Sequence, residues 1–181
     1  MKVRKLFLGV VPVILAGALA GCSDTNKSPE VTDNIRKSLD QAGYKDVSVS
    51  QDREKGVVTL TGTVPAEGDK AQAESIAKSS ADSQVVADQI SVRPPGNESD
   101  AKTVDSDTDK AIEKKLDAVL VKNKLDRGVK YDVKNGVVTL KGDVPSQSRR
   151  TQVEKLAKTV PDVKQVVNEL EVKNQKATAT S

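Results

Sequence analysis

The residues that usually carry enzyme chemistry are almost absent from this sequence. Its 181 residues include no His, no Trp and one Cys. Without imidazole there is no Ser-His-Asp or Cys-His triad and no His-ligated metal centre of the usual kinds. A lone thiol cannot form an intrachain disulfide or a thiolate zinc site. We therefore expect a noncatalytic protein without metal or cofactor, whose function depends on aliphatic packing, charge and backbone.

The single thiol, Cys22, directly follows an apolar segment. Three basic residues lie among the first five positions, and the apolar run covers residues 6–21, fewer than the roughly 20 residues of a spanning helix. A basic start and a short apolar run indicate an export signal. The run ends Leu19-Ala20-Gly21-Cys22, which resembles the bacterial lipobox, where a signal peptidase cuts before a Cys carrying a diacylglyceryl group. We expect residues 1–21 to be a lipoprotein signal peptide and Cys22 to be lipidated. The alternatives are an ordinary signal peptide with a chance Cys, or a single anchor helix.

The lipobox resemblance implies a protein held at a membrane while its polypeptide stays in water. Each buried methylene contributes about 0.8 kcal/mol, so one acyl chain holds marginally and two or three hold firmly. In Gram-negative lipoproteins an Asp after the acylated Cys favours retention in the inner membrane. Ser23 occupies that position here, which points to the outer membrane, facing the periplasm. Residues 22–29 would then be a tether.

The rest of the chain is a tandem duplication with an offset of 80 residues. Residues 56–65, GVVTLTGTVP, match residues 136–145, GVVTLKGDVP. The match continues without a gap to Val92 and Val172. We predict one domain over 30–94 and a second over 106–173.

Both copies show the same pattern of elements. Apolar residues at helical spacing predict a first helix, and alternating residues predict a hairpin whose turn ends at Gly56 or Gly136. Pro65 and Pro145 end its second strand, and a second helix and a last strand follow. The predicted class is α+β, each domain having the order αββαβ, with two helices packed on a three-stranded sheet. Domains of about 65 residues bury only about 60% of their chain surface, so packing of one copy on the other is left open.

The segments outside the two copies are polar. Pro94-Pro95-Gly96 opens a stretch rich in Ser, Thr and Asp, which predicts a solvated linker over 95–105. Asp105–Asp109 has the opening spacing of a calcium loop, but Lys110 stands where Gly is needed and Leu116 where the bidentate Glu should be. We therefore expect no calcium site there. Residues 174–181 are expected to form a disordered tail.

The repeated strand motif, the αββαβ order and the closing run VVNELEV of residues 166–172 resemble the BON-domain family of bacterial envelope proteins. Two such domains behind a lipobox resemble the dual-BON envelope lipoproteins. The resemblance implies no catalytic residues and an association with phospholipid binding, envelope integrity and osmotic stress. Copy one departs further from the family, since Ser80-Ala81-Asp82-Ser83 stands where copy two has Val160-Pro161-Asp162-Val163.

Charge is divided unevenly between the copies. Residues 30–95 hold 8 basic and 11 acidic residues, whereas residues 106–173 hold 15 basic and 11 acidic ones. The second copy places Arg149 and Arg150 at the start of a predicted helix, where bases are disfavoured by about 0.3–1 kcal/mol each. Lys155 and Lys158 continue along that helix, and each base near an anionic surface contributes about 1 kcal/mol. These four residues are the candidates for phospholipid binding, and a merely solvated face is the alternative.

The leading hypothesis is a noncatalytic lipid-anchored envelope protein whose second domain binds anionic phospholipid. The alternative is a protein-binding adaptor of the periplasm or outer membrane that presents sheet edges or helix faces to another envelope protein. Tyr44 and Tyr131 are the only aromatic residues after Phe7, too few for a base-stacking platform, so no nucleic-acid partner is expected.

Overall fold

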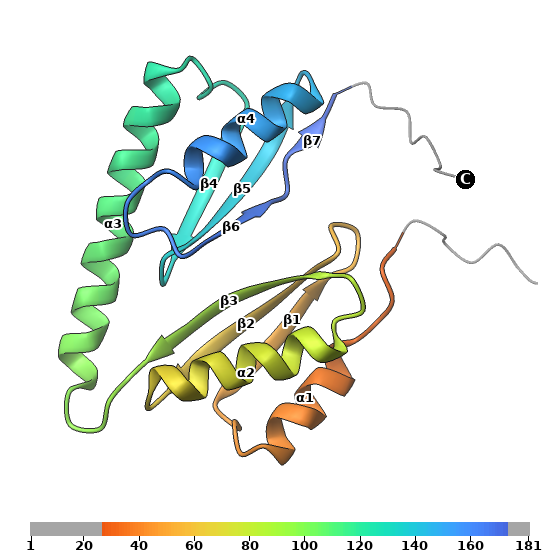
Figure 1. Ribbon diagram of the computed structural model, residues 1–181, viewed down its shortest axis with the longest axis vertical. Helices are drawn as coiled ribbons and strands as arrows, with labels where there is room; N and C mark the ends of the chain where they lie inside the picture. The colour runs from red at the N-terminus through yellow and green to blue at the C-terminus, as the bar shows by residue number, and fades with distance from the viewer. Residues whose placement is uncertain (1–26, 174–181) are drawn as a thin grey trace, which may run out of the picture.

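The computed structural model describes residues 27–173, and the chain builds the same arrangement of elements twice within them (Figure 1). The predicted signal peptide, Cys22 and the predicted tail lie outside the described residues. Domain 1 consists of α1 (Thr32–Gln41), β1 (Val47–Asp52), β2 (Val57–Val64), α2 (Glu67–Ser80) and β3 (Val85–Val92). Domain 2 consists of α3 (Glu98–Lys122), β4 (Val129–Lys134), β5 (Val137–Val144), α4 (Gln147–Ala157), β6 (Gln165–Asn168) and β7 (Glu171–Val172). The predicted α+β class and αββαβ order are confirmed.

Both sheets have the second strand of the hairpin at their centre. In domain 1, β2 pairs antiparallel with β1 and parallel with β3. Domain 2 repeats this register at the offset of 80, since Val57 pairs with Val85 and Val137 pairs with Gln165. The last strand of domain 2 is split into β6 and β7, although one continuous strand was expected. The register survives the gap, because Asp143 still pairs with Glu171.

Each domain has its own aliphatic core between the helices and one face of its sheet. The largest fully buried side chains of domain 1 include Ile35, Leu39, Leu60 and Ile90. The largest fully buried side chains of domain 2 include Ile112, Leu116, Leu120 and Leu140. Burying such a side chain contributes about 1.5–3 kcal/mol. Because the two cores do not share residues, each domain buries apolar surface of its own.

In each hairpin a glycine of the second strand lies very close to the backbone at the start of the first strand. Gly62 and Gly142 have φ values of +117° and +109°, a region that residues with a Cβ rarely adopt. A Cβ atom on Gly62 would lie 2.0 Å from the carbonyl oxygen of Asp46, and one on Gly142 would lie 2.3 Å from that of Gly128. The repeated glycine is therefore required by close backbone approach.

The segment between the domains is mostly helical, although a solvated linker was predicted over 95–105. A turn through Pro94 and Gly96 ends at Asn97, and α3 then begins at Glu98. Acidic residues in the first turn favour a helix start, and the Arg93 guanidinium lies 2.6 Å from the Asp105 carboxylate, which holds the helix against the end of β3. The composition of this segment is poor for a helix, so these tertiary contacts stabilise it. No helix within residues 27–173, α3 included, is long and apolar enough to cross a membrane.

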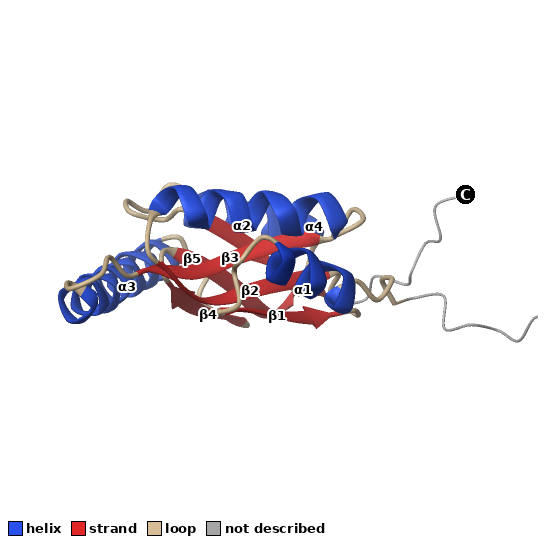
Figure 2. Ribbon diagram, turned by 90° about the horizontal axis from the view of Figure 1, so that it is seen from below, coloured by secondary structure: helices blue, strands red, loops and turns tan. Residues whose placement is uncertain are grey.

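The two sheets meet along their β3 and β6 edges, which run side by side in opposite directions (Figure 1). Seen from below, α2 and α4 lie together on one side of both sheets (Figure 2). Val57, Ala87, Val137 and Val167 form a small buried apolar cluster across this contact. The domains therefore pack on each other.

Candidate functional site

The first two predicted phospholipid-binding residues, Arg149 and Arg150, are half-buried in the first turn of α4. The Arg149 guanidinium donates to the carbonyl oxygen of Lys124 at 2.5 Å, and that of Arg150 donates to the carbonyl oxygen of Asn168 at 2.9 Å. The Nε atoms of both arginines are buried without a hydrogen-bond partner. These bases connect α4 to the loop after α3 and to β6, which gives a structural reason for their place at a helix start.

The other two predicted residues, Lys155 and Lys158, are exposed in the last turn of α4 and at the cap that follows it. The Lys158 ammonium lies 2.6 Å from the Glu154 carboxylate. The hydrogen bond from the Asn168 side chain lowers the pKa of the Glu154 carboxyl most, and the hydrogen bond from Lys158 lowers it further. This carboxylate therefore stays charged beside Lys158. The four predicted residues thus do not form one uniform cationic face.

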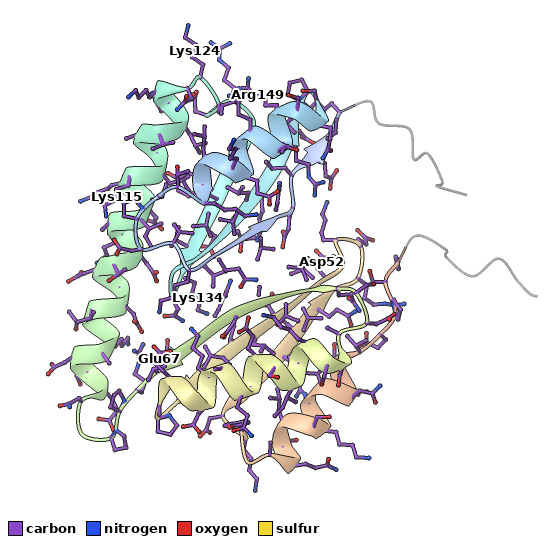
Figure 3. All side chains as sticks on the ribbon, in the orientation of Figure 1. Asp52, Glu67, Lys115, Lys124, Lys134 and Arg149 are labelled. Atoms are coloured by element: carbon purple, nitrogen blue, oxygen red, sulfur yellow. The ribbon has the colours of Figure 1, made fainter. Side chains whose placement is uncertain are left out.

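A different group of bases gathers at one end of domain 2, and we call it the basic end. It consists of residues from the last turn of α3, the following loop and the first turn of α4: Lys122, Lys124, Arg127 and Arg149. Figure 3 shows Lys124 and Arg149 together at this end. Lys122, Lys124 and Arg127 are exposed. Asp126 and Asp143 lie at the same end, so four bases face two acids.

The equivalent end of domain 1 has the opposite charge. By the same definition it carries one base, Lys45, and four acids: Asp40, Asp46, Glu67 and Asp69. Burial raises the pKa of the Tyr44 hydroxyl there, and the adjacent Asp69 carboxylate raises it further. Lys122 and Lys124 were not among the predicted residues, because they lie in the last turn of α3 and in the loop after it, away from the helix start on which the prediction rests. The run KNKLDR over 122–127 was the available signal.

A polar network is repeated on the last strands of the two domains, β3 and β6. In domain 1 the Lys70 ammonium donates to the carbonyl oxygen of Ile90 at 2.8 Å and lies 3.9 Å from the Asp88 carboxylate. Asp88 is buried and accepts from its neighbour Ile90 N–H at 3.1 Å. In domain 2 Arg150 and Asn168 replace the pair, and Asn168 accepts from Leu170 N–H at 3.2 Å.

Burial raises the pKa of the Asp88 carboxyl. The hydrogen bond from Ile90 N–H and the Lys70 charge oppose this effect, while Glu74 and Glu67 add to it. The desolvation of this carboxyl is therefore incompletely compensated by its neighbours.

Polar contacts between the domains cover the free edge of β3. The Gln165 amide donates to the carbonyl oxygen of Val86 at 2.7 Å and accepts from Asp88 N–H at 3.1 Å. The Asn135 amide donates to the carbonyl oxygen of Gln89 at 2.7 Å. A cleft of about 320 Å³ beside this edge is lined by side chains of both domains, including Lys70, Lys78, Lys164 and Gln165. Within residues 27–173, no three His, Cys, Asp or Glu side chains are grouped to hold a metal ion.

The fold and these surfaces define a tandem protein of two equivalent α+β domains that differ mainly in surface charge. The chain belongs to the BON-domain family, whose model matches residues 27–94 and 108–174. The predicted family resemblance is thereby confirmed.

One relative is similar to this chain along most of its length. Osmotically-inducible protein Y of Escherichia coli (strain K12) is 32% identical over 146 residues, which cover 79% of this chain and 71% of that protein. Among solved structures, the chain is similar to the C-terminal domain of CdsD, the structural protein of the Type III secretion system of Chlamydia trachomatis. That match has 14% identity and a TM-score of 0.32, and it covers 78% of this chain and 65% of that chain. A second CdsD structure gives 14% identity and a TM-score of 0.33, with 77% of this chain and 90% of that chain covered.

Proposed function

We propose that this chain is a noncatalytic, lipid-anchored envelope protein that binds anionic phospholipid through domain 2 and supports envelope integrity or osmotic stress tolerance. Membership of the BON family and similarity to an osmotically-inducible protein support this role. The observation that carries the lipid-binding part is the charge contrast between equivalent ends, basic in domain 2 and acidic in domain 1. A lipid surface rich in phosphate would bind the first and repel the second.

The size of the effect explains why an anchor would matter. Four bases near an anionic surface contribute at most about 4 kcal/mol in total, which corresponds to a dissociation constant no tighter than roughly millimolar. Domain 2 alone would therefore bind a bilayer weakly. An acyl anchor on Cys22 raises the effective concentration at the membrane, so weak electrostatic contacts become sufficient to orient the protein.

The start of the described chain lies on a suitable side for such an anchor. Ser28 N–H donates to the carbonyl oxygen of Arg53 at 2.8 Å, beside the turn between β1 and β2. A cleft of about 300 Å³ connects this turn with α4, because Lys55 and Arg150 both line it. Four residues separate Cys22 from Lys27, so an extended chain would place these two residues at most about 18 Å apart. A lipidated Cys22 would hold this side of the molecule near the bilayer.

Vesicle co-sedimentation tests the lipid-binding surface. We would use the chain from residue 23 onward, without acyl groups, and vesicles of phosphatidylglycerol, cardiolipin or neutral phosphatidylcholine. We expect sedimentation with the two anionic vesicles only. Replacing Lys122→Glu and Lys124→Glu together should weaken it more than tenfold, since each reversal exchanges an attraction of about 1 kcal/mol for a repulsion.

The charge-matched control is the pair Lys155→Glu and Lys158→Glu, which tests the α4 face that the sequence predicts. Arg149 and Arg150 are less suitable, because their side chains hold backbone carbonyls. Equal sedimentation of the wild type with neutral and anionic vesicles, or of the wild type and the Lys122/Lys124 variant with anionic ones, would refute the proposal. Crosslinking to an envelope protein without vesicle affinity would support an adaptor instead.

Mass spectrometry of the protein from envelope membranes tests the anchor separately. We expect a chain that begins at Cys22 and carries acyl groups. An uncleaved leader or an unmodified thiol would rule out the anchor and leave the vesicle test unaffected.

A further inference from the structure

The contact between the domains has pseudo-twofold symmetry. Its apolar cluster contains Val57 and Ala87 from domain 1 and Val137 and Val167 from domain 2. These are the same two positions of the repeat, related by the offset of 80. In Figure 1 a half-turn about the centre of the molecule brings α2 onto α4 and the edge of β3 onto the edge of β6. The duplicated domains thus meet like the subunits of an isologous dimer.

The polar contacts on either side of the cluster obey the same symmetry. On one side Ser91 donates from Oγ to the Oδ1 atom of Asn135 at 3.0 Å. On the other side the Lys55 ammonium pairs with the Glu171 carboxylate. Lys55 is the repeat equivalent of Asn135, and Ser91 is the equivalent of Glu171. Each flank therefore joins the hairpin turn of one domain to the last strand of the other.

Domain 2 holds the more complete half of this contact. Its Gln165 side chain makes two hydrogen bonds to the free edge of β3, at Val86 and Asp88. The equivalent residue of domain 1 is Val85, which is 47% exposed and cannot donate or accept through its side chain. Only domain 2 can cover a strand edge in this way.

Domain 2 is also compatible with a second copy of itself. A twofold pair of domain 2 would place Val137 and Val167 of each copy against the same residues of the other. Asn135 would face Glu171, where an amide N–H can donate to a carboxylate. Gln165 would face the backbone of Val166 and Asn168, the equivalents of the Val86 and Asp88 groups that it already binds. A pair of domain 1 would lack the glutamine on both sides.

We propose that the surface of domain 2 centred on Val137 and Val167 binds domain 2 of a second copy of this chain whenever domain 1 does not occupy it. In the wild-type chain domain 1 occupies this surface in preference to a second copy, because a short connection gives domain 1 a high effective concentration. The wild-type chain is then a monomer with a closed interface. This inference does not depend on lipid binding.

The test displaces domain 1 without damaging its core. Val57 and Ala87 are buried by the interdomain cluster and do not belong to the core of domain 1. In the chain from residue 23 onward, we expect Val57→Lys and, independently, Ala87→Glu to expose the domain 2 surface. Light scattering after size exclusion should then show a doubled mass, whereas the wild type should remain monomeric.

Two matched variants control the result. Ser48→Lys introduces the same charge on an exposed position of the neighbouring strand, where domain 2 already has Lys130, and should leave a monomer. Adding Val137→Lys to Val57→Lys should restore the monomeric mass, because it removes the docking surface. Lys55→Glu, which sets two carboxylates against each other across the contact, gives a third route to the dimer.

The proposal fails if the domain 1 variants keep native circular dichroism and stay monomeric at high concentration. It also fails if the double variant with Val137→Lys still doubles in mass, or if Ser48→Lys doubles as well.

Discussion

At the scale of single residues, the two domains differ in the pair of side chains that lies at the edge of the last strand. Both domains cover the free edge of their last strand with a base from the second helix and a short side chain on the strand. Domain 1 uses Lys70 with the buried acid Asp88, whereas domain 2 uses Arg150 with the neutral Asn168. Desolvation raises the pKa of the buried Asp88 carboxyl, which gives this network a titratable group that the Arg150–Asn168 pair lacks.

This difference predicts a pH-dependent effect of Asp88→Asn. A raised folded pKa means that the fold binds the proton more tightly than the unfolded chain does, whose carboxyl titrates near 3.8. The free energy of unfolding of the wild type should therefore rise, relative to that of the variant, as pH falls through the folded pKa toward the unfolded one. Urea unfolding at a series of pH values measures this difference.

The control for Asp88→Asn adds Lys70→Arg, which recreates the pair found in domain 2. It should remove the same pH dependence while keeping a base on the strand edge. A difference between wild type and Asp88→Asn that is constant across the acidic range would contradict the assignment.

At the scale of elements, the second helices of the two domains begin differently. Ser146 precedes α4 and accepts from Arg149 N–H at 3.2 Å, while Ala66 precedes α2 and provides no side-chain cap. The backbone of the two residues is nearly the same, with φ and ψ of −155° and 157° at Ser146 and −141° and 157° at Ala66. The conformation required for capping is thus present in both copies.

We predict that Ala66→Ser stabilises domain 1 by about 1 kcal/mol and that Ser146→Ala destabilises domain 2 by about the same amount. In each case the hydroxyl satisfies an N–H group that is otherwise left to water. Chemical denaturation of the four combinations measures both effects. A loss of stability with Ala66→Ser would show that the start of α2 is held by other contacts.

At the scale of the whole molecule, the domain contact changes what the free edge of β3 exposes. Asp88 N–H donates across the contact to Gln165, whereas Ile90 N–H donates within its own domain to Asp88. The Asp88 amide thus reports on the contact between the domains, and the Ile90 amide reports on domain 1 alone. Their hydrogen exchange distinguishes a closed arrangement from two independent domains.

We predict that Gln165→Ala speeds exchange of the Asp88 amide up to about tenfold, since a net hydrogen bond contributes about 0.5–1.5 kcal/mol. The Ile90 amide should be unaffected, because its acceptor remains. Leu170, the equivalent of Ile90 in domain 2, is the second control. Unchanged exchange at Asp88, measured by NMR, would mean that the domains do not hold this contact in solution.

Much of the fold was predictable because its signals are local. The apolar periodicity of Ile35 and Leu39, the alternation around Val58 and Leu60 and the repeated glycines all act over a few residues. A repeat shows the same local signals twice, which separates them from chance. The family resemblance rests on the same motifs.

The candidate surfaces were less predictable, because they depend on which segments meet. Arg149 and Arg150 look cationic and available in the sequence, but the fold directs them at the carbonyl oxygens of Lys124 and Asn168. Lys122 and Lys124 form a basic surface with Arg149 only because the loop after α3 lies beside the start of α4. Likewise, the polar segment after Asn97 is part of a helix whose contact with domain 1, between Arg93 and Asp105, joins residues that only the turn through Gly96 brings together.

Local pattern alone thus set the order of elements, the two cores and the duplication, since these follow from side-chain spacing within one copy. Tertiary structure alone decided the charge of each end and the contact between the copies. Those features combine residues far apart in the chain, such as Val57 with Val137 and Gln165 with Val86. Their proximity depends on the crossing of whole strands and helices, which no short stretch of sequence encodes.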